Sequence, residues 1–377
     1  METPLTRGLP PRVSVAVIGG GPAGSATALG LAQSGVQVAL VTGAEEEGWK
    51  IGESLPPAAR PALQRLGVWE RFAADGHLPA FGNCAAWGAA SLREHHFIFD
   101  PHGHGWHLDR RRFDRMLAHA AADAGALVGG RLSVTECQPA AGGGWELTLL
   151  SRGARPGRIE AGFVVDATGR RSWLGRRSGA RRVSHDALIA AAALLVPGRE
   201  SRGHGGMTLV EASEHGWWYC APVPGAKLVA AFMTDGDLES ARAARAIAGW
   251  RALLARTTYL GARAEADDWR IERGPVIVSA NSAHLRPAAG KSWLAVGDAA
   301  ISCDPLSAQG ILTALQSGAL AADAIRAHFA GRRQALADYV RLVDGILAEY
   351  LVNRDVFYAQ ESRWASAPFW RRRQKPR

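Results

Sequence analysis

The stretch that decides the fold is VSVAVIGGGPAG, Val13 to Gly24. Its apolar, β-branched start predicts a buried parallel strand over 13–18, and the small residues that follow predict a helix over 22–34. Gly19, Gly21 and Gly24 form the pattern G-x-G-x-x-G at the junction. There the first glycine permits a tight turn, the second lets backbone approach a pyrophosphate, and the third lets the helix pack on the strand. Helix N-termini attract phosphate, so Gly19, Gly21, Pro22, Ala23 and Gly24 are predicted to bind a dinucleotide.

A second strand over 36–42 completes a βαβ unit. The acid that binds the adenosine ribose in such units is expected about 20 residues after the glycines, near Thr42 or Gly43. The acids that are present, Glu45 to Glu47, come slightly later. The sequence therefore does not identify the residue that contacts the ribose.

A second motif, WLAVGDAAISCDPLSAQGI from Trp293 to Ile311, favours FAD over NAD. It reads as an apolar strand that ends at Gly297 and Asp298, followed by a long helix that starts near Ser307. An aspartate at a strand end can accept hydrogen bonds from a polyol. A helix N-terminus offers amide groups and a partial positive charge to an anionic ring, which a reduced flavin provides.

Composition limits the class of protein. The chain has 377 residues, of which 47% are hydrophobic, and this is enough for a large core in two or three domains. The net charge of +9 comes almost entirely from arginine and suits an anionic cofactor or an acidic partner, while no nucleic-acid motif is visible. Four widely spaced cysteines, no evident signal peptide and no apolar segment of membrane-spanning length lead us to expect a reduced, cytoplasmic protein.

The order of expected elements gives the fold class as α/β. We predict a Rossmann-like FAD-binding domain of the glutathione-reductase type, with an inserted antiparallel-sheet substrate domain and a C-terminal helical tail. The FAD-binding domain would be discontinuous and comprise residues 1–82, 108–183 and 273–330. The substrate domain would comprise 83–107 and 184–272, and the helical, basic segment would comprise 331–377. Within the first of these domains, a helix is expected over 60–72, and Asp109 is expected to cap a second helix that Gly125 ends. A helical stretch is expected over 238–256 in the substrate domain.

Taken in order, these motifs resemble FAD-dependent monooxygenases of the para-hydroxybenzoate hydroxylase type, and more closely their flavin-dependent halogenase-like branch. The matching stretches are Gly19–Gly24, KIGESLPP at 50–57, LDRRRFDRML at 108–117, VVDATGRRS at 164–172, GWWYCAP at 216–222 and residues 297–311. The resemblance implies that Gly297 and Asp298 bind the ribityl chain, and that Arg110 and Ser54 contact the cofactor. It also implies that the flavin ring is lined by Pro305, Ser307, Ala308, Gln309, Gly310 and Ile311. Trp217 and Tyr219 are candidates for the wall of the substrate pocket.

One feature of the halogenases is missing from this sequence. Chlorinating members of that branch hold a lysine on a strand soon after the glycine–glutamate loop, whereas this sequence has no lysine from Ile51 to Ala226. Arg93 lies in the corresponding region, but arginine is bulkier and keeps its proton. Halogenation is therefore disfavoured.

A closer likeness is carried by CAAWGAASL, HHFIFDPHGHGWHLDRRRFD, DPLSAQGI and ESRWASAPFWRRR. These stretches look like the flavoprotein maturases of tryptophylquinone-containing lysine ε-oxidase, glycine oxidase and quinohemoprotein amine dehydrogenase. The resemblance implies that reduced FAD takes up O₂ as a C4a-hydroperoxide and hydroxylates a tryptophan of a partner enzyme precursor. Electrons would come from NAD(P)H directly or from a flavin reductase. Lys50 and Glu53 are the candidates for catalytic residues near the reacting ring, and either could equally be loop structure.

Several alternatives stay open. The substrate could be a small aromatic molecule, or the chain could be a halogenase, a flavin-dependent reductase of isoprenoid double bonds or a partner-binding chaperone with a relic flavin. Five histidines, His95, His96, His102, His104 and His107, suggest a metal site at first sight. Their spacing along alternating strands separates the rings onto different faces, so we expect no metal. Because the sequence shows neither a nucleic-acid motif nor an apolar segment of membrane-spanning length, we also expect no nucleic acid and no membrane as partners.

Overall fold

The computed structural model describes residues 9–43, 49–151, 155–198 and 206–374. Its first large sheet has eight strands, and six of them follow the order β19-β20-β11-β1-β2-β8. Strand β1 pairs in parallel with β11 on one side and with β2 on the other, as expected for a strand whose last four residues are buried. The strands are β1 (Arg12–Ile18), β2 (Val38–Val41), β8 (Leu127–Gly129), β9 (Ser133–Pro139), β10 (Trp145–Leu150), β11 (Gly157–Asp166), β19 (Ala289–Gly290) and β20 (Trp293–Ala295).

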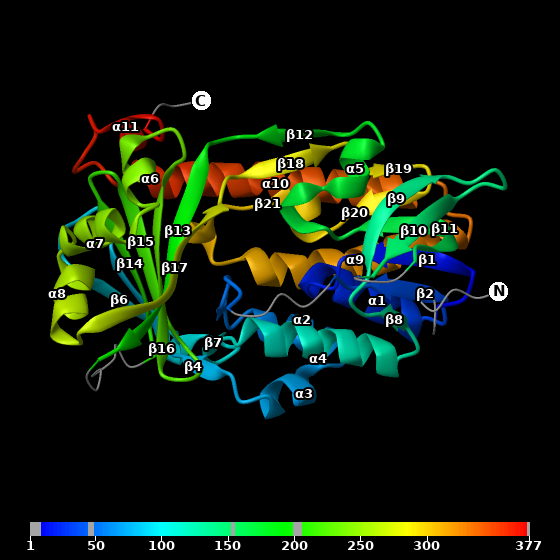
Figure 1. Cartoon of the computed structure of the whole chain (residues 1–377), viewed down its shortest axis with the longest axis horizontal. Helices are drawn as coiled ribbons and strands as arrows, with labels where there is room; N and C mark the ends of the chain where they lie inside the picture. The colour runs from blue at the N-terminus through cyan, green and yellow to red at the C-terminus, as the bar shows by residue number, and fades with distance from the viewer. Residues whose placement is uncertain (1–8, 44–48, 152–154, 199–205, 375–377) are drawn as a thin grey trace.

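Helices cover this sheet and connect its strands (Figure 1). Helix α1 packs against both α9 and α4, and its small residues let the three helices approach closely. Gly318 of α9, for example, lies so near α1 that a Cβ atom would be 2.5 Å from the carbonyl oxygen of Ala23. The helices of this region are α1 (Pro22–Gln33), α2 (Ala59–Arg65), α3 (Trp69–Ala74), α4 (Arg110–Asp123), α5 (Trp173–Arg177) and α9 (Gly310–Phe329).

The second large sheet has seven strands in the order β17-β13-β16-β15-β14-β5-β6. It is antiparallel except for β14 and β5, which pair in parallel. The strands are β5 (Gly82–Ala86), β6 (Arg93–His96), β13 (Leu188–Pro197), β14 (Thr208–Ser213), β15 (Gly216–Val223), β16 (Lys227–Asp235) and β17 (Trp269–Ser279). Strand β17 pairs with β13 as far as Ser279, so the sheet continues past the predicted boundary at residue 272.

Each face of the seven-stranded sheet has its own apolar core, because successive side chains on a strand point to opposite faces. Trp218, Phe232 and Trp250 belong to the core under α7 and α8. Trp217 and Met233 belong to the other core, which the C-terminal helices cover. The helices are α6 (Glu239–Ala243), α7 (Ile247–Ala255), α8 (Tyr259–Ala266), α10 (Ala335–Ala359) and α11 (Pro368–Arg371).

Helix α10 runs from the FAD-binding part to the seven-stranded sheet, where α11 and the C-terminus also lie (Figure 1). The structure also contains two small sheets of three strands each. One contains β12 (Arg181–Ser184), β18 (Ala283–Arg286) and β21 (Ile301–Ser302), and the other contains β3 (Ser54–Leu55), β4 (Leu78–Ala80) and β7 (Gly105–His107). Residues 105–107, predicted in the substrate domain, therefore pair with the loop that follows β2 instead.

Several helix boundaries differ from the sequence prediction. The helix expected over 60–72 is two helices, because Gly67 takes a left-handed conformation with φ of 70° between α2 and α3. The stretch 238–256 is likewise divided into α6 and α7. Helix α4 matches its prediction: Asp109 accepts hydrogen bonds from the backbone of Arg111 and Arg112, and Gly125 follows the helix with φ of 101°.

Among the described residues, no helix is both long and apolar enough to cross a lipid bilayer. The four cysteines are free thiols.

Candidate active site

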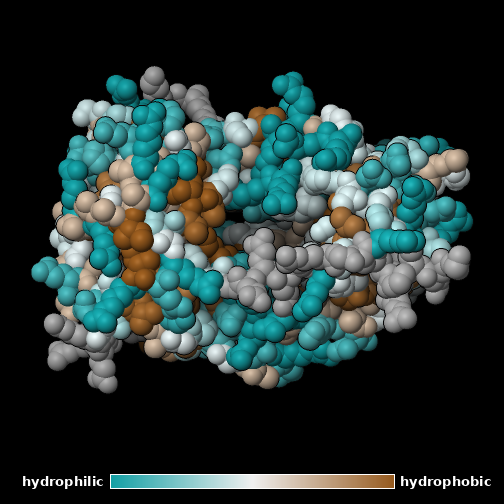
Figure 2. All heavy atoms as spheres, viewed as in Figure 1, coloured by the Kyte–Doolittle hydropathy of each residue, from teal (hydrophilic) through white to brown (hydrophobic). Residues whose placement is uncertain are grey.

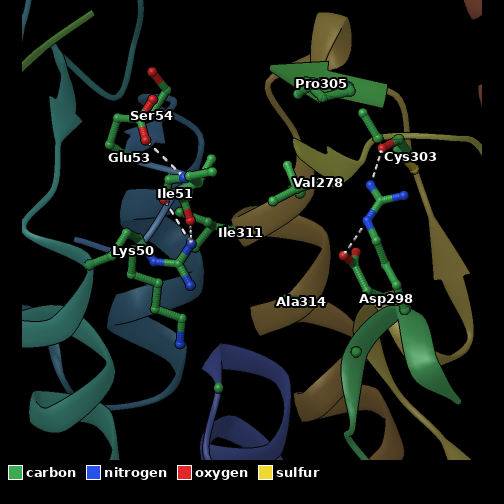
Figure 3. A pocket seen from close by; sticks show the side chains of 18 of the residues that line it. Lys50, Ile51, Glu53, Ser54, Val278, Asp298, Cys303, Pro305, Ile311 and Ala314 are labelled. Atoms are coloured by element: carbon green, nitrogen blue, oxygen red, sulfur yellow. Dashed lines mark hydrogen bonds and ion pairs between the residues drawn. The ribbon is translucent and has the colours of Figure 1, made fainter. Parts of the chain in front are cut away.

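A cavity of about 430 Å³ lies where the two parts of the molecule meet. Its wall comes from the start of α1, the loop 50–54, Arg110 of α4, the seven-stranded sheet and the segment 296–314. In Figure 3, Lys50, Ile51, Glu53 and Ser54 lie on one side, Asp298, Cys303 and Pro305 on the other, and Val278 and Ile311 between them. The predicted site residues that line it are Gly21, Pro22, Ala23, Lys50, Glu53, Ser54, Arg110, Tyr219, Asp298, Pro305, Ala308, Gly310 and Ile311.

Five predicted cofactor residues stand outside the cavity wall: Gly19, Gly24, Gly297, Ser307 and Gln309. Three of these residues, Gly19, Gly24 and Gly297, shape the backbone behind the cavity wall. A Cβ atom on Gly24 would lie 1.9 Å from the carbonyl oxygen of Gly19, and one on Gly19 would lie 2.3 Å from that of Ala167. At Gly297 it would meet the Cβ of Ala23 at 2.7 Å. These glycines let backbone segments pack closely, and this packing fixes the position of the turn.

The turn at the start of α1 fits a dinucleotide phosphate. Gly21 is the N-cap residue of α1; no side chain caps the helix there, and its first turn contains no acid. A Cβ atom on Gly21 would meet nothing within 4 Å, so the space in front of these amides is open. Uncapped helix N-termini bind anions through free N–H groups and the helix dipole. The acids Glu45 to Glu47, considered for the ribose, lie outside the described residues.

The loop 50–54 is held in place by Arg110. Its Nη1 atom donates hydrogen bonds to the carbonyl oxygens of Ile51, at 3.1 Å, and Gly52, at 2.7 Å. Gly52 has φ of 97°, a backbone conformation that favours glycine, and a Cβ atom on it would lie 2.6 Å from the same Nη1 atom. The Nε atom of Arg110 is buried without a partner among the described residues. A buried donor without a partner in a cavity wall fits a site for a polar group of the cofactor.

Lys50 and Glu53 differ in their surroundings. The ammonium group of Lys50 donates to the carboxylate of Asp114, and about half of the lysine side chain is exposed. Glu53 is buried, and it accepts a hydrogen bond from the backbone N–H of Gly52 at 2.8 Å. Burial raises the pKa of Glu53, an effect that hydrogen bonds from Tyr219 and Gly52 and the charge of Arg110 oppose. Glu53 therefore gains a proton more readily than an exposed glutamate, whereas Lys50 is engaged in an ion pair.

Tyr219 connects the seven-stranded sheet to the loop. Its hydroxyl lies 2.7 Å from the hydroxyl of Ser54, and burial together with the carboxylate of Glu53 raises the pKa of the phenol. Tyr219 lines the cavity, as the sequence suggested. The same prediction is wrong for Trp217, two residues earlier on the same face. Trp217 is fully buried, and its indole N–H donates to the hydroxyl of Tyr358 at 2.9 Å, because the C-terminal helices cover that end of the strand.

On the opposite side, Asp298 is near an arginine that the sequence analysis did not single out. Arg170 approaches the carboxylate of Asp298 with its Nε atom at 3.4 Å and donates to the carbonyl oxygens of Asn281 and Cys303. The Asp298 side chain remains partly exposed to the cavity and can accept further hydrogen bonds. The signal for Arg170 was the stretch VVDATGRRS, which places it in the turn after β11.

The segment after Asp298 contains a second missed residue, Asp304. Its buried carboxylate accepts from the backbone of Leu306 at 2.9 Å and from the hydroxyl of Tyr358 at 2.6 Å. Burial raises the pKa of Asp304 to about 6. Pro305 to Ser307 form a short 3₁₀ turn, and Ala308 takes a left-handed conformation with φ of 50°, so α9 begins at Gly310 and not near Ser307. A non-glycine residue with this backbone in a cavity wall is typical of a functional turn.

The five histidines lie apart. His95 and His96 are exposed on β6, His104 contacts the backbone of Gly105, and His107 is buried next to Thr208. Among the residues that the structure describes, no three His, Cys, Asp or Glu side chains gather in a way that could hold a metal ion.

The glycine turn, the open helix start and the second polar site at Asp298 define a flavin-binding protein. The chain belongs to the FAD binding domain family, whose sequence profile matches residues 12–341. It is an FAD-dependent oxidoreductase, and FAD is its cofactor. Residues Gly19 to Gly24 would hold the diphosphate, with Asp298 and the turn 305–311 at the other end of the cofactor.

Comparison with individual proteins describes the fold more closely. It is 28% identical to the putative FAD-dependent oxidoreductase LodB of Marinomonas mediterranea over 361 residues, which is 95% of each chain. Its fold matches that of the myxobacterial chondrochloren halogenase CndH with a TM-score of 0.87 and 23% identity, covering 97% of this chain and 87% of the halogenase. It also matches the peptidyl tryptophan dihydroxylase QhpG, with a TM-score of 0.71 and 22% identity, over 96% and 79% of the two chains. The fold is thus that of the flavin-dependent halogenases and hydroxylases.

Proposed function

We propose that this chain is an FAD-dependent monooxygenase that hydroxylates the indole ring of a tryptophan in a partner protein during tryptophylquinone formation. The observation that carries the proposal is the lysine content of the cavity. Of the residues that line it, Lys50 is the one lysine, and its ammonium group is bound to Asp114. It also precedes the glycine–glutamate loop, whereas the halogenase lysine described above follows that loop. The chain therefore lacks a free amine in the position that chlorination needs.

The substrate side of the cavity is apolar. Ala190, Val229, Ala231, Met233 and Val278, all from the seven-stranded sheet, form this wall. Such a wall suits an aromatic ring that must be held away from water. QhpG, a peptidyl tryptophan dihydroxylase essential for tryptophylquinone cofactor biogenesis, has a similar fold, and this supports an indole as that ring.

Bound FAD supplies the redox chemistry with O₂, so the residues of this chain act by binding, orienting and controlling protons. Glu53 and the Tyr219–Ser54 hydroxyl pair are the polar groups next to the apolar wall. In this proposal, a protonated Glu53 or the Tyr219 hydroxyl donates a hydrogen bond within a site that excludes water. Lys50 holds the loop through Asp114 and does not touch the substrate.

The test uses the FAD-loaded chain, NADH, a flavin reductase and heavy-isotope O₂, with a tryptophan-containing peptide as the probe. We expect the peptide to gain heavy oxygen at the indole ring, read by tandem mass spectrometry, and to gain none when FAD is omitted. A peptide that stays unchanged while free indole or another small aromatic is oxidised would contradict the protein-substrate part of the proposal.

A second candidate is halogenation, because the fold closely matches a halogenase. The same reaction run in bromide buffer separates the two functions. Bromine on the indole ring would favour the halogenase, and oxygen alone would favour the hydroxylase.

A further inference from the structure

Strand β17 is an open edge of the seven-stranded sheet. It pairs with β13, and no other described strand pairs with its outer side. An edge strand presents a row of unpaired N–H and C=O groups that another extended chain can join.

Only part of this edge is suited to pairing. The register between β17 and β13 shifts around Gly274 and Pro275, and Pro275 has no N–H group to donate. Bulges and prolines protect edge strands from unwanted partners. The remaining run, Val276 to Ser279, is regular and paired residue by residue with β13.

This run leads directly into the candidate active site. Val278, Ser279 and Ala280 line the cavity, and Val278 is paired with Ala190, which lines it too. Because side chains alternate along a strand, Val276 shares a face with Val278. A strand added along this edge would have every second side chain on the same face, next to the cavity.

The surface beside the run is apolar. Val276 is 42% exposed, and Ile277 and Val278 are half-buried. Figure 2 shows a hollow near the middle of this face, with apolar side chains bordering it on the side of the seven-stranded sheet. An exposed apolar surface next to a cavity is typical of a binding site.

The charge near the run favours an acidic partner. Arg273 is exposed on β17 and takes part in no ion pair among the described residues, whereas Arg270 is paired with Asp268. The whole chain carries +9. Complementary charges steer partners and set specificity more than they add affinity.

We propose that an extended, acidic segment of the protein substrate binds as an additional strand along Val276–Ser279 and so presents its tryptophan to the cavity. This inference rests on the proposed function. It adds the docking mode: backbone pairing supplies the binding energy, and Arg273 selects an acidic sequence.

The first experiment measures binding of a fluorescent ten-residue peptide to the FAD-loaded chain without reductant, by anisotropy. The peptide has a central tryptophan flanked by alternating valine and aspartate. Two variants carry backbone N-methyl groups on the odd or on the even residues. Because one set of N–H groups faces the protein in an added strand, one variant should bind at least about tenfold more weakly and the other should stay within about twofold. Equal affinity for both variants, or no binding of the parent peptide, would overturn the proposal.

The second experiment tests the charge. Arg273→Glu should weaken the acidic peptide about tenfold. A peptide with lysine in place of aspartate should bind this variant better than the unchanged chain. Arg155→Glu is the matched control, because it changes the net charge equally on the β10–β11 connection, at the other end of the molecule (Figure 1). Equal loss in both variants would mean unspecific attraction and would refute a role for Arg273.

Turnover separates this inference from the proposed function. A peptide that binds with alternating N-methyl sensitivity and is never oxidised would refute the function alone. A peptide that is oxidised whichever set of residues is methylated would refute strand addition alone.

Discussion

The three glycines of the first turn have different physical roles. Gly24 allows α1 to contact Gly19, whereas Gly21 faces open space. Gly24→Ala should therefore destabilise the FAD-free protein by about 1–3 kcal/mol, because its methyl group overlaps backbone. Gly21→Ala should cost less, below about 1 kcal/mol: its φ of −77° suits alanine and the space is empty, and alanine is only a poorer N-cap residue than glycine. The same methyl group should weaken FAD binding at least about tenfold by blocking the approach of the phosphate.

Chemical denaturation and calorimetric titration of FAD measure these two effects separately. If Gly21→Ala unfolds the protein as much as Gly24→Ala does, Gly21 is a packing residue and the cradle is misassigned.

Asp304 should make stability depend on pH. Its pKa is about 6 in the folded chain against an ordinary value of 3.8, so between these values the folded state holds a proton that the unfolded state has lost. Stability from this group is therefore highest below about pH 4 and falls by about 3 kcal/mol as the pH rises through 6. In Asp304→Asn this contribution is absent. The variant's free energy of unfolding, relative to the unchanged chain, should rise over that range in urea titrations of the FAD-free protein. A difference that is independent of pH would contradict the burial argument.

At the level of residues, the sequence predicted those whose chemistry is local. Gly21, Ser54, Arg110 and Asp298 line the cavity because each stands in a motif whose backbone directs it there. Tyr219 and Trp217 share a strand face, and only the packing of a distant helix decides which of them is covered. The sequence did not reveal Asp304, because an aspartate before a proline is typical of an ordinary turn. The residue that binds its carboxylate, Tyr358, is 54 positions away in the sequence.

At the level of elements, α10 supports the turn that carries Asp304. The hydroxyl of Tyr350 on this helix accepts a hydrogen bond from the backbone N–H of Asp304 at 2.7 Å. The hydroxyl of Tyr358 donates to Asp304 and accepts from the indole N–H of Trp217. Tyr358→Phe should remove both bonds of the Tyr358 hydroxyl and leave the buried Trp217 N–H without a partner, which costs about 1–3 kcal/mol. FAD affinity should fall as well, because the turn 304–308 loses a restraint.

The control for this change is on the same helix. Phe357 is 54% exposed, so Phe357→Tyr adds a hydroxyl that reaches solvent and should leave both stability and FAD binding unchanged. A Tyr358→Phe variant that binds FAD as tightly as the unchanged chain would mean that α10 stabilises the fold without supporting the site.

At the scale of the whole molecule, the sequence predicted an α/β fold with an FAD-binding part, a second sheet and helices at the C-terminus. The sequence did not predict which elements far apart in the chain lie side by side. Strand β17 is the edge of the second sheet only because its residues match β13, about 80 positions earlier, and no local pattern reports such a match. The C-terminal helices likewise looked like a separate tail, whereas Phe369 and Trp370 are fully buried in the core under the second sheet.

This arrangement predicts how FAD binding acts on unfolding. The cavity is lined by α1, the loop 50–54, the second sheet and α9 together, and α10 packs into the cores of both parts. FAD bound there should stabilise the chain as one cooperative unit, by about 2.7 kcal/mol when free FAD is 100 times the Kd. Calorimetry should then show one transition that moves to higher temperature with added FAD. Two transitions, of which only the one for the FAD-binding part moves, would mean that the second sheet folds independently and contributes little to the cofactor site.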